Sequence, residues 1–145
     1  MTINVKAYSQ NEVQMTYQIQ LAQSSNFVST IFGRRCNIKG INDKNFNVRG
    51  FAERQAINAP IQGSAADIIK LAMIQIHNKI ISKEILAKML LQVHDELIFE
   101  INEKDIKESS IIIKQIMENS HLQYKDFVVP LTVDYGIGNT WGESH

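Results

Sequence analysis

The hydrophobic pattern of the chain begins with a helix followed by two short strands. Residues 27–32, which apart from Ser29 are apolar or β-branched, predict a strand that ends at Gly33, and a second short strand is expected at residues 36–38. The turn between them would leave Arg34 and Arg35 exposed. Before these strands, apolar residues recur every four positions and predict a helix of polar character: Val13, Tyr17 and Leu21.

A long helical pattern begins near Phe46, and Pro60 and Gly63 interrupt it. Proline inside a helix removes a hydrogen bond and clashes with the preceding turn, so we expect a kink or a break there. Ser64-Ala-Ala-Asp67 has the form of a capping box and is expected to start a second helix over roughly residues 65–81. Apolar side chains cover most of its circumference, which indicates burial against a sheet: Ile68, Ile69, Leu71, Ala72, Met73, Ile74 and Ile76.

The rest of the chain predicts a hairpin, a helix and a strand. Residues 88–93 and 96–101 are strand-like runs separated only by His94-Asp95, which favours a tight hairpin although His-Asp is not a preferred turn pair. Asn102 is expected to cap the next helix, with acidic residues in its first turn. A last strand is expected at residues 128–135. This order of elements predicts an α+β fold, with helices packed on an antiparallel sheet.

The composition is that of a soluble globular protein. The 145 residues are enough to bury a core, and no repeat or flexible linker divides residues 1–145 into separate domains. No apolar run approaches the roughly 18 residues that span a bilayer, so no membrane partner is expected. The first ten residues lack the pattern of a secretory signal. Cys36 is the single cysteine, which excludes a disulfide within the chain and indicates a reducing, cytoplasmic setting.

The formal net charge of zero hides an uneven distribution. Residues 1–81 hold nine Lys/Arg against four Asp/Glu, and residues 82–145 hold six against eleven. A basic segment followed by an acidic one suits a protein that holds a phosphate backbone beside a carboxylate site. The alternative is an unevenly charged surface with no ligand. Six of the basic residues lie within a short stretch: Arg34, Arg35, Lys39, Lys44, Arg49 and Arg54.

Two segments carry candidate chemistry. His94, Asp95 and Glu96 lie where the hairpin turns, and an exposed carboxylate at a rigid tip can bind magnesium together with substrate phosphates and water. Two such ions about 4 Å apart can promote nucleotidyl transfer. Taken alone, such a triplet is more often the polar tip of an ordinary hairpin.

The second segment is a row of polar residues at helical spacing. Arg54, Asn58 and Gln62 are four residues apart, so a helix would align them along one stripe. Their donors suit the minor-groove acceptors, which A·T and G·C pairs present in similar positions. A grip that ignores base sequence is what a polymerase needs. The alternative interpretation is a helix cap with a buried amide network.

Together, these segments closely resemble the C-terminal part of family A DNA polymerases, the family of bacterial DNA polymerase I. The resemblance is clearest over residues 26–145 and weaker before them. The chain stops just after Trp141, where bacterial members typically end, so we expect a natural C-terminus. The matching segments follow one another in order: Phe32-Gly33-Arg34-Arg35, Arg54-x-x-x-Asn58-x-Pro60-x-Gln62-Gly63, residues 65–73, Gln92-Val93-His94-Asp95-Glu96-Leu97 and Gly136-Ile137-Gly138-x-x-Trp141.

The resemblance implies roles for these residues in template-directed synthesis from a deoxynucleoside triphosphate onto a primer 3′-hydroxyl. Asp95 corresponds to the second metal-binding aspartate of the palm, Glu96 to its neighbouring acid and His94 to a residue near the primer terminus. Magnesium and primer-template DNA are the implied cofactor and partner, and the implied location is the bacterial nucleoid in the cytoplasm. Arg54, Asn58 and Gln62 correspond to minor-groove contacts. On the ground of charge alone, we expect phosphate contacts from Arg34, Arg35 and Arg49.

Other parts of the family pattern are missing from the sequence. The other metal-binding aspartate belongs to a motif resembling Asp-Tyr-Ser-x-Ile-Glu-Leu-Arg, but here Ala7 precedes Tyr8-Ser9 and the remainder is absent. The fingers helix that binds the incoming nucleotide is absent as well, so we expect a complete site to need the N-terminal polymerase segment. We therefore expect no polymerase activity from the isolated chain, which is either a piece of a longer polymerase or the product of a truncated or split gene. The alternatives are a stand-alone DNA-binding remnant without catalysis and a nonfunctional α+β domain.

Overall fold

The structure is a computed structural model that describes residues 2–6, 12–122 and 130–144. The chain divides into two compact units, and the boundary between them follows Asp67. We call residues 12–67 the basic unit, and residues 2–6, 68–122 and 130–144 the hairpin unit. The boundary lies inside one helix, α2 (Phe46–Ile81), so the sequence shows no linker at this point.

The basic unit contains α1 (Glu12–Ser25), the paired strands β2 (Phe27–Ser29) and β3 (Arg35–Asn37), and the first part of α2. The expected N-terminal helix and both short strands are confirmed. The first strand ends earlier than expected, because the chain turns at Thr30, whose carbonyl accepts the Gly33 N–H at 2.9 Å. A small core closes the unit: Ala22, Val28, Ile38, Ile41, Ala52 and Ala56.

Helix α2 runs without interruption through Pro60 and Gly63, so the expected break is wrong, and so is a second helix starting at Ser64. The Ser64 hydroxyl does not cap a helix. It donates to the carbonyl of Pro60 at 2.5 Å and accepts the N–H of Ile31 at 3.0 Å. The turn after β2 therefore packs on α2 at this level, and contacts distant in sequence override the local signals of proline and glycine.

The hairpin unit takes its name from β4 (Ala87–Val93) and β5 (Glu96–Ile101), which pair antiparallel around His94-Asp95 as the sequence predicts. His94 has a φ of 51°, the left-handed conformation that two-residue hairpin turns require. The pairing shifts between Met89 and Leu91, where Leu90 forms a bulge. The bulge leaves both Leu90 and Leu91 exposed on the strand.

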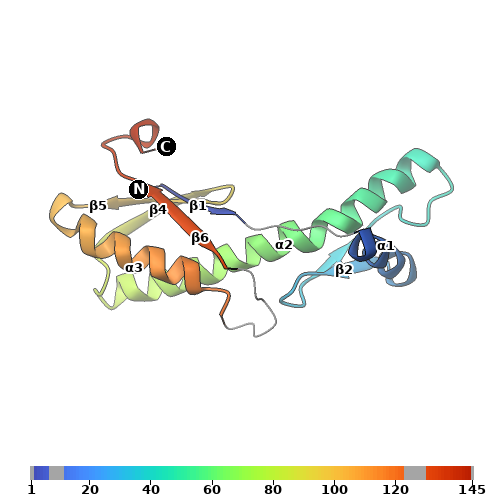
Figure 1. The fold of residues 1–145 in the computed structure, drawn as a ribbon, viewed down its shortest axis with the longest axis horizontal. Helices are drawn as coiled ribbons and strands as arrows, with labels where there is room; N and C mark the ends of the chain where they lie inside the picture. The colour runs from blue at the N-terminus through green and yellow to red at the C-terminus, as the bar shows by residue number, and fades with distance from the viewer. Residues whose placement is uncertain (1, 7–11, 123–129, 145) are drawn as a thin grey trace. The chain divides into compact units, whose positions relative to one another are not determined.

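Two further strands come from opposite ends of the chain. Strand β1 (Thr2–Lys6) pairs antiparallel with β6 (Thr132–Gly136), and Figure 1 shows the first strand lying along the last. The sequence pattern did not indicate β1. The expected strand over residues 128–135 is found from residue 132 onward, and residues 123–129 lie outside the described part of the chain.

Two helical segments follow the hairpin, η1 (Glu103–Asp105) and α3 (Ile106–Asn119), and a short turn, η2 (Trp141–Glu143), lies near the C-terminus. The helix predicted after Asn102 is confirmed, but the Asn102 side chain makes no capping bond and the segment begins as a 3-10 turn. The expected cap is therefore wrong, because the backbone satisfies this end: the Asp105 N–H donates to the Asn102 carbonyl at 2.9 Å.

The core of the hairpin unit joins α2, β5, α3 and β6, and it confirms the burial of Ile69, Ala72 and Ile76. Burial around most of the circumference of α2 is wrong, since Ile74 is 58% exposed. The fold is α+β, as the order of elements predicts. Within the described residues, no helix is long and apolar enough to cross a membrane. The core residues are Ile69, Ala72, Ile76, Ile85, Leu97, Phe99, Ile113, Met117 and Val133.

Candidate nucleic-acid interface and carboxylate tip

Helix α2 carries the predicted polar stripe on its exposed side. Arg54, Asn58 and Gln62 are all exposed, while Ala52 and Ala56, half a turn away, are fully buried in the core of the basic unit. One helix face therefore holds the unit together, and the opposite face presents a guanidinium and two amides to solvent. Arg54 forms no ion pair with any residue in the described ranges, so its charge is available to a ligand.

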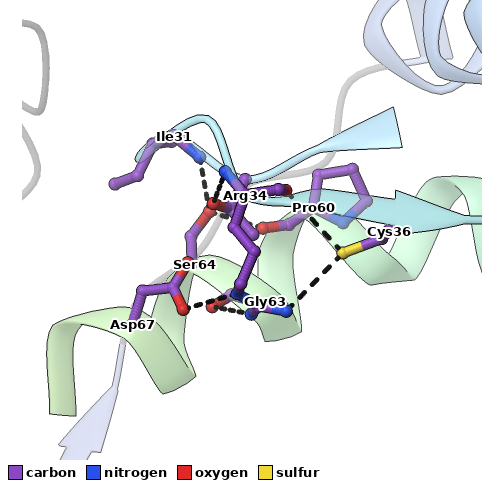
Figure 2. A network of polar contacts seen from close by, with 8 residues as sticks. Ile31, Arg34, Cys36, Pro60, Gly63, Ser64 and Asp67 are labelled. Atoms are coloured by element: carbon purple, nitrogen blue, oxygen red, sulfur yellow. Dashed lines mark hydrogen bonds and ion pairs between the residues drawn. The ribbon is translucent and has the colours of Figure 1, made fainter. Parts of the chain in front are cut away.

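Arg34, in the turn between β2 and β3, and Arg35, the first residue of β3, lie in different surroundings, although both are exposed as predicted. The Arg34 guanidinium reaches α2, where Nε lies 2.8 Å from Asp67 Oδ1 and Nη2 donates to the Gly63 carbonyl at 3.0 Å (Figure 2). The hydrogen bond from Arg34 to Asp67 raises the pKa of the guanidinium above its ordinary high value, while desolvation opposes the shift. Arg34 is therefore permanently charged and already paired.

Arg35 and Arg49 complete the set of arginines predicted to meet phosphates. The Arg35 guanidinium lies 4.7 Å from the centre of the Phe27 ring, a cation–π contact that leaves its donors exposed. Arg49 is half-buried, donates to the Asp43 carbonyl at 3.1 Å and lies 3.9 Å from a Glu53 carboxylate oxygen. Of these three arginines, Arg35 has no carboxylate partner among the described residues.

The hairpin tip presents the predicted carboxylates unequally. His94 and Asp95 are exposed, whereas Glu96 is 7% exposed as the first residue of β5. The Gln92 amide donates to the His94 carbonyl at 2.9 Å and holds the turn. The tip therefore offers solvent one carboxylate, that of Asp95, at the turn of a two-stranded antiparallel pair.

A complete metal site is not found among the described residues, since no group of three His, Cys, Asp or Glu side chains there could hold an ion. The donors at the tip fit a single contact to a hard cation. Magnesium accepts one or two carboxylates when phosphates and water supply its other oxygens. Asp95 fits that part, since its side chain is exposed at the turn.

The structure groups the predicted residues by unit. The basic unit holds the stripe and the arginines, and the hairpin unit holds the acidic tip. Sequence reasoning missed Gly63, Ser64 and Asp67 as the residues that receive the β2–β3 turn. The available signal was three small or short polar residues within one helical turn and a half, which lets a neighbouring segment approach the helix backbone closely.

Comparisons with known proteins identify the family of the chain. A family model described as DNA polymerase family A matches residues 4–143. The DNA polymerase I of Lactococcus lactis is 44% identical over 140 residues, which cover 97% of this chain and 15% of that protein. The DNA polymerase I of Bacillus subtilis is 45% identical over 137 residues, which cover 94% of this chain and 14% of that protein.

A solved structure shows the same fold. The POL domain of Pol1 from M. smegmatis, in complex with DNA primer-template and dNTP, superposes with a TM-score of 0.82 at 39% identity. The match covers 90% of this chain and 22% of that one, so this chain spans a small part of the proteins it resembles. The family match over nearly the whole chain shows that the protein belongs to DNA polymerase family A.

Proposed function

We propose that this chain supplies a DNA-gripping helix and a metal-binding carboxylate to template-directed DNA synthesis, as part of a polymerase domain to which all of residues 1–145 belong. The observation that carries the proposal is the exposed row of Arg54, Asn58 and Gln62 opposite a buried alanine face. Support comes from the related POL domain, which was solved with primer-template and dNTP. Such a function would place the protein at the bacterial nucleoid, in the cytoplasm.

The stripe has the chemistry for reading the shape of paired DNA without reading its sequence. The guanidinium of Arg54 and the amides of Asn58 and Gln62 can donate to purine N3 and pyrimidine O2, which occupy similar places in every base pair. Arg35 and, more weakly, Arg49 would hold phosphates on the same unit, since each keeps donors near the surface. His94 would lie near the primer terminus.

Asp95 is the proposed metal ligand, with Glu96 beside it. Bound magnesium would offset charge on the nucleotide phosphates and on the attacking 3′-oxygen. The part of Asp95 is to hold one coordination position from a rigid hairpin, while Gln92 fixes the backbone of the turn. One exposed carboxylate cannot complete a two-ion site, so we expect synthesis only together with the remaining polymerase segment and none from the 145-residue protein alone.

A second candidate function is DNA binding without catalysis. The observation that favours it is the exposed polar stripe on α2, together with a hairpin tip at which no group of three candidate metal ligands is found within the described residues. In that case the protein would grip primed duplex through the basic unit, and Asp95 would have no effect on any reaction. The two functions share the stripe and differ only in the role of the tip.

The stripe is tested by fluorescence anisotropy of a labelled primed duplex titrated with the 145-residue protein at several salt concentrations. Replacing Arg54, Asn58 and Gln62 together by alanine should weaken binding by roughly tenfold or more, the effect of about 1.4 kcal/mol. Gln55→Ala controls for a change on the same helix, and Lys107→Gln controls for charge, since both residues are exposed. Equal binding by the triple variant and the wild type would remove the basis of the proposal.

A further inference from the structure

We propose that Arg34 is a positioning residue, not a phosphate contact: it fastens the turn at residues 30–34 to α2 and so holds Arg35 and Gln62 in place for DNA. This inference rests on the proposed function for its consequence and on contacts within the basic unit for its cause. It assigns opposite tasks to two adjacent arginines that the sequence alone presents as equivalent.

The first support is the engagement of the guanidinium. Arg34 uses two donors of its planar guanidinium on α2, with Nε on Asp67 Oδ1 at 2.8 Å and Nη2 on the Gly63 carbonyl at 3.0 Å (Figure 2). The Asp67 side chain is 12% exposed, and its Oδ2 is buried and accepts no hydrogen bond from the described residues. Moving Arg34 to a phosphate would leave this carboxylate without its cation, which is a heavy penalty for a largely buried charge.

The second support is that the same turn is anchored independently by its backbone. The Ile31 N–H donates to Ser64 Oγ at 3.0 Å, and the Arg34 N–H donates to Thr30 Oγ1 at 3.2 Å. Gly63 leaves room for this approach, because a Cβ at that position would lie 2.7 Å from Thr30 Cγ2 and 3.1 Å from Arg34 Nη2. The turn therefore lies directly on the backbone of the helix. The Arg34 side chain adds a second attachment to α2 at the end of the turn.

The third support is the contrast with the next residue. Arg35 has no carboxylate partner in the described ranges, and its contact with the Phe27 ring leaves its charge uncompensated. Asp67 offsets the charge of Arg34, so a phosphate approaching the turn meets the field of Arg35 first. Gln62 precedes the glycine whose carbonyl Arg34 binds, so fastening the turn also fixes the surroundings of the last stripe residue. A loosened turn would have to be ordered again on binding, which weakens affinity.

The test uses the 145-residue protein and primed duplex. The readout is the absolute value of the slope of log affinity against log salt concentration, called the slope below. A lost phosphate contact lowers this slope by about 0.9 in duplex DNA. We expect Arg34→Gln, Arg34→Lys and Asp67→Asn each to weaken binding by about threefold or more with an unchanged slope. Lysine keeps the charge but cannot reproduce the fork. Arg35→Gln is the matched control, and it should lower the slope.

A second readout needs no DNA. Amide hydrogen exchange of Ile31 reports docking of the turn, because its N–H is bonded to Ser64, and the Ala56 amide in the core serves as the reference. Arg34→Lys and Asp67→Asn should accelerate exchange at Ile31 by about threefold or more relative to Ala56, and Arg35→Gln should not. This ratio also separates local loosening from global unfolding.

The inference is overturned if Arg34→Gln lowers the salt slope as Arg35→Gln does, if Asp67→Asn tightens binding by freeing the arginine, or if Ile31 exchange is unchanged in Arg34→Lys. If the wild-type protein fails to bind primed duplex at any salt concentration, the proposed function is contradicted. In that case the exchange ratio still decides whether Arg34 fastens the turn.

Discussion

Gly63 lies so close to the side chain of Thr30 that a Cβ built on the glycine would come within 2.7 Å of Thr30 Cγ2. Thr30 is only 4% exposed and β-branched, so its methyl group has little freedom to move aside. This pair explains a glycine in the middle of a 36-residue helix. Gly63 lowers the helix propensity of this segment, but it permits the β2–β3 turn to pack against the helix backbone.

Gly63→Ala should therefore destabilise the protein, because overpacking costs about 1–3 kcal/mol and exceeds the gain in helix propensity of up to about 1 kcal/mol. The measurement is the free energy of unfolding by urea. Gly50→Ala on the same helix is the matched control, since a Cβ there meets only Arg54 Nη1 at an ordinary 3.8 Å. That variant should be stabilised by roughly 0.5–1 kcal/mol, and a gain of the same size at both glycines would contradict close packing at Gly63.

Ser64→Ala should also destabilise the basic unit. The hydroxyl is buried and joins the Ile31 N–H to the Pro60 carbonyl, so its removal leaves a backbone donor unsatisfied, at a cost of about 1–3 kcal/mol. Ser24→Ala provides the comparison, because Ser24 bonds the Leu21 carbonyl on an exposed helix surface. Urea unfolding of both variants gives the difference, and equal stability of the two would show that Ser64 has no special role.

Two isoleucines of α2 test the core of the hairpin unit. Ile76 is fully buried and Ile74 is 58% exposed on the same helix. Ile76→Ala should cost about 2–5 kcal/mol through lost burial and a residual cavity, and Ile74→Ala should cost far less. Thermal unfolding followed by circular dichroism compares them. A similar loss of stability for both variants would mean that α2 does not bury Ile76 and expose Ile74 as the structure shows.

Glu84 predicts a small dependence of stability on pH. A hydrogen bond from Lys79, aided by one from Ser82, lowers the pKa of the Glu84 carboxylate. A carboxylate with a lowered pKa adds stability above its unfolded pKa, and this is lost as the pH falls through the folded pKa. Glu84→Gln should thus be less stable than the wild type near pH 7, and the difference should vanish well below pH 4, since the ordinary glutamate pKa is about 4.3. A difference that persists in strong acid would exclude the Lys79 contact as its cause.

The sequence predicted the elements with strong local periodicity and missed those set by distant contacts. Two strand-like runs separated only by His94-Asp95 were sufficient to predict the β4–β5 hairpin. Pro60 suggested a break in α2, but packing of the β2–β3 turn keeps the helix continuous there. Strand β1 was not expected, because its partner β6 lies about 130 residues further along the chain, at the pairing of Thr2 with Gly136.

Among the candidate site residues, too, those with a local sequence signal were predicted and those that depend on distant contacts were not. Spacing alone placed Arg54, Asn58 and Gln62 on one helix face, since a period of 3.6 residues is a local property. Sequence spacing could not distinguish Arg34 from Arg35. Their difference depends on Asp67, a residue 33 positions away from Arg34 that local reasoning had assigned to a helix cap. A side chain whose role depends on a partner distant in the sequence can be recognised only from the structure.

We propose that Asp95 is a catalytic carboxylate that this chain contributes to a family A polymerase. The most direct measurement is primer extension by a chimera in which residues 4–143 replace the matching segment of the Bacillus subtilis DNA polymerase I. We predict that the chimera extends a primer. Asp95→Asn should lower the extension rate by about a hundredfold or more, the scale lost with a preorganised electrostatic group. DNA affinity should stay the same, and Glu100→Gln, an exposed carboxylate on the same hairpin, should extend normally. Undiminished extension by Asp95→Asn, or a chimera that binds primed DNA and never extends it, would contradict the claim.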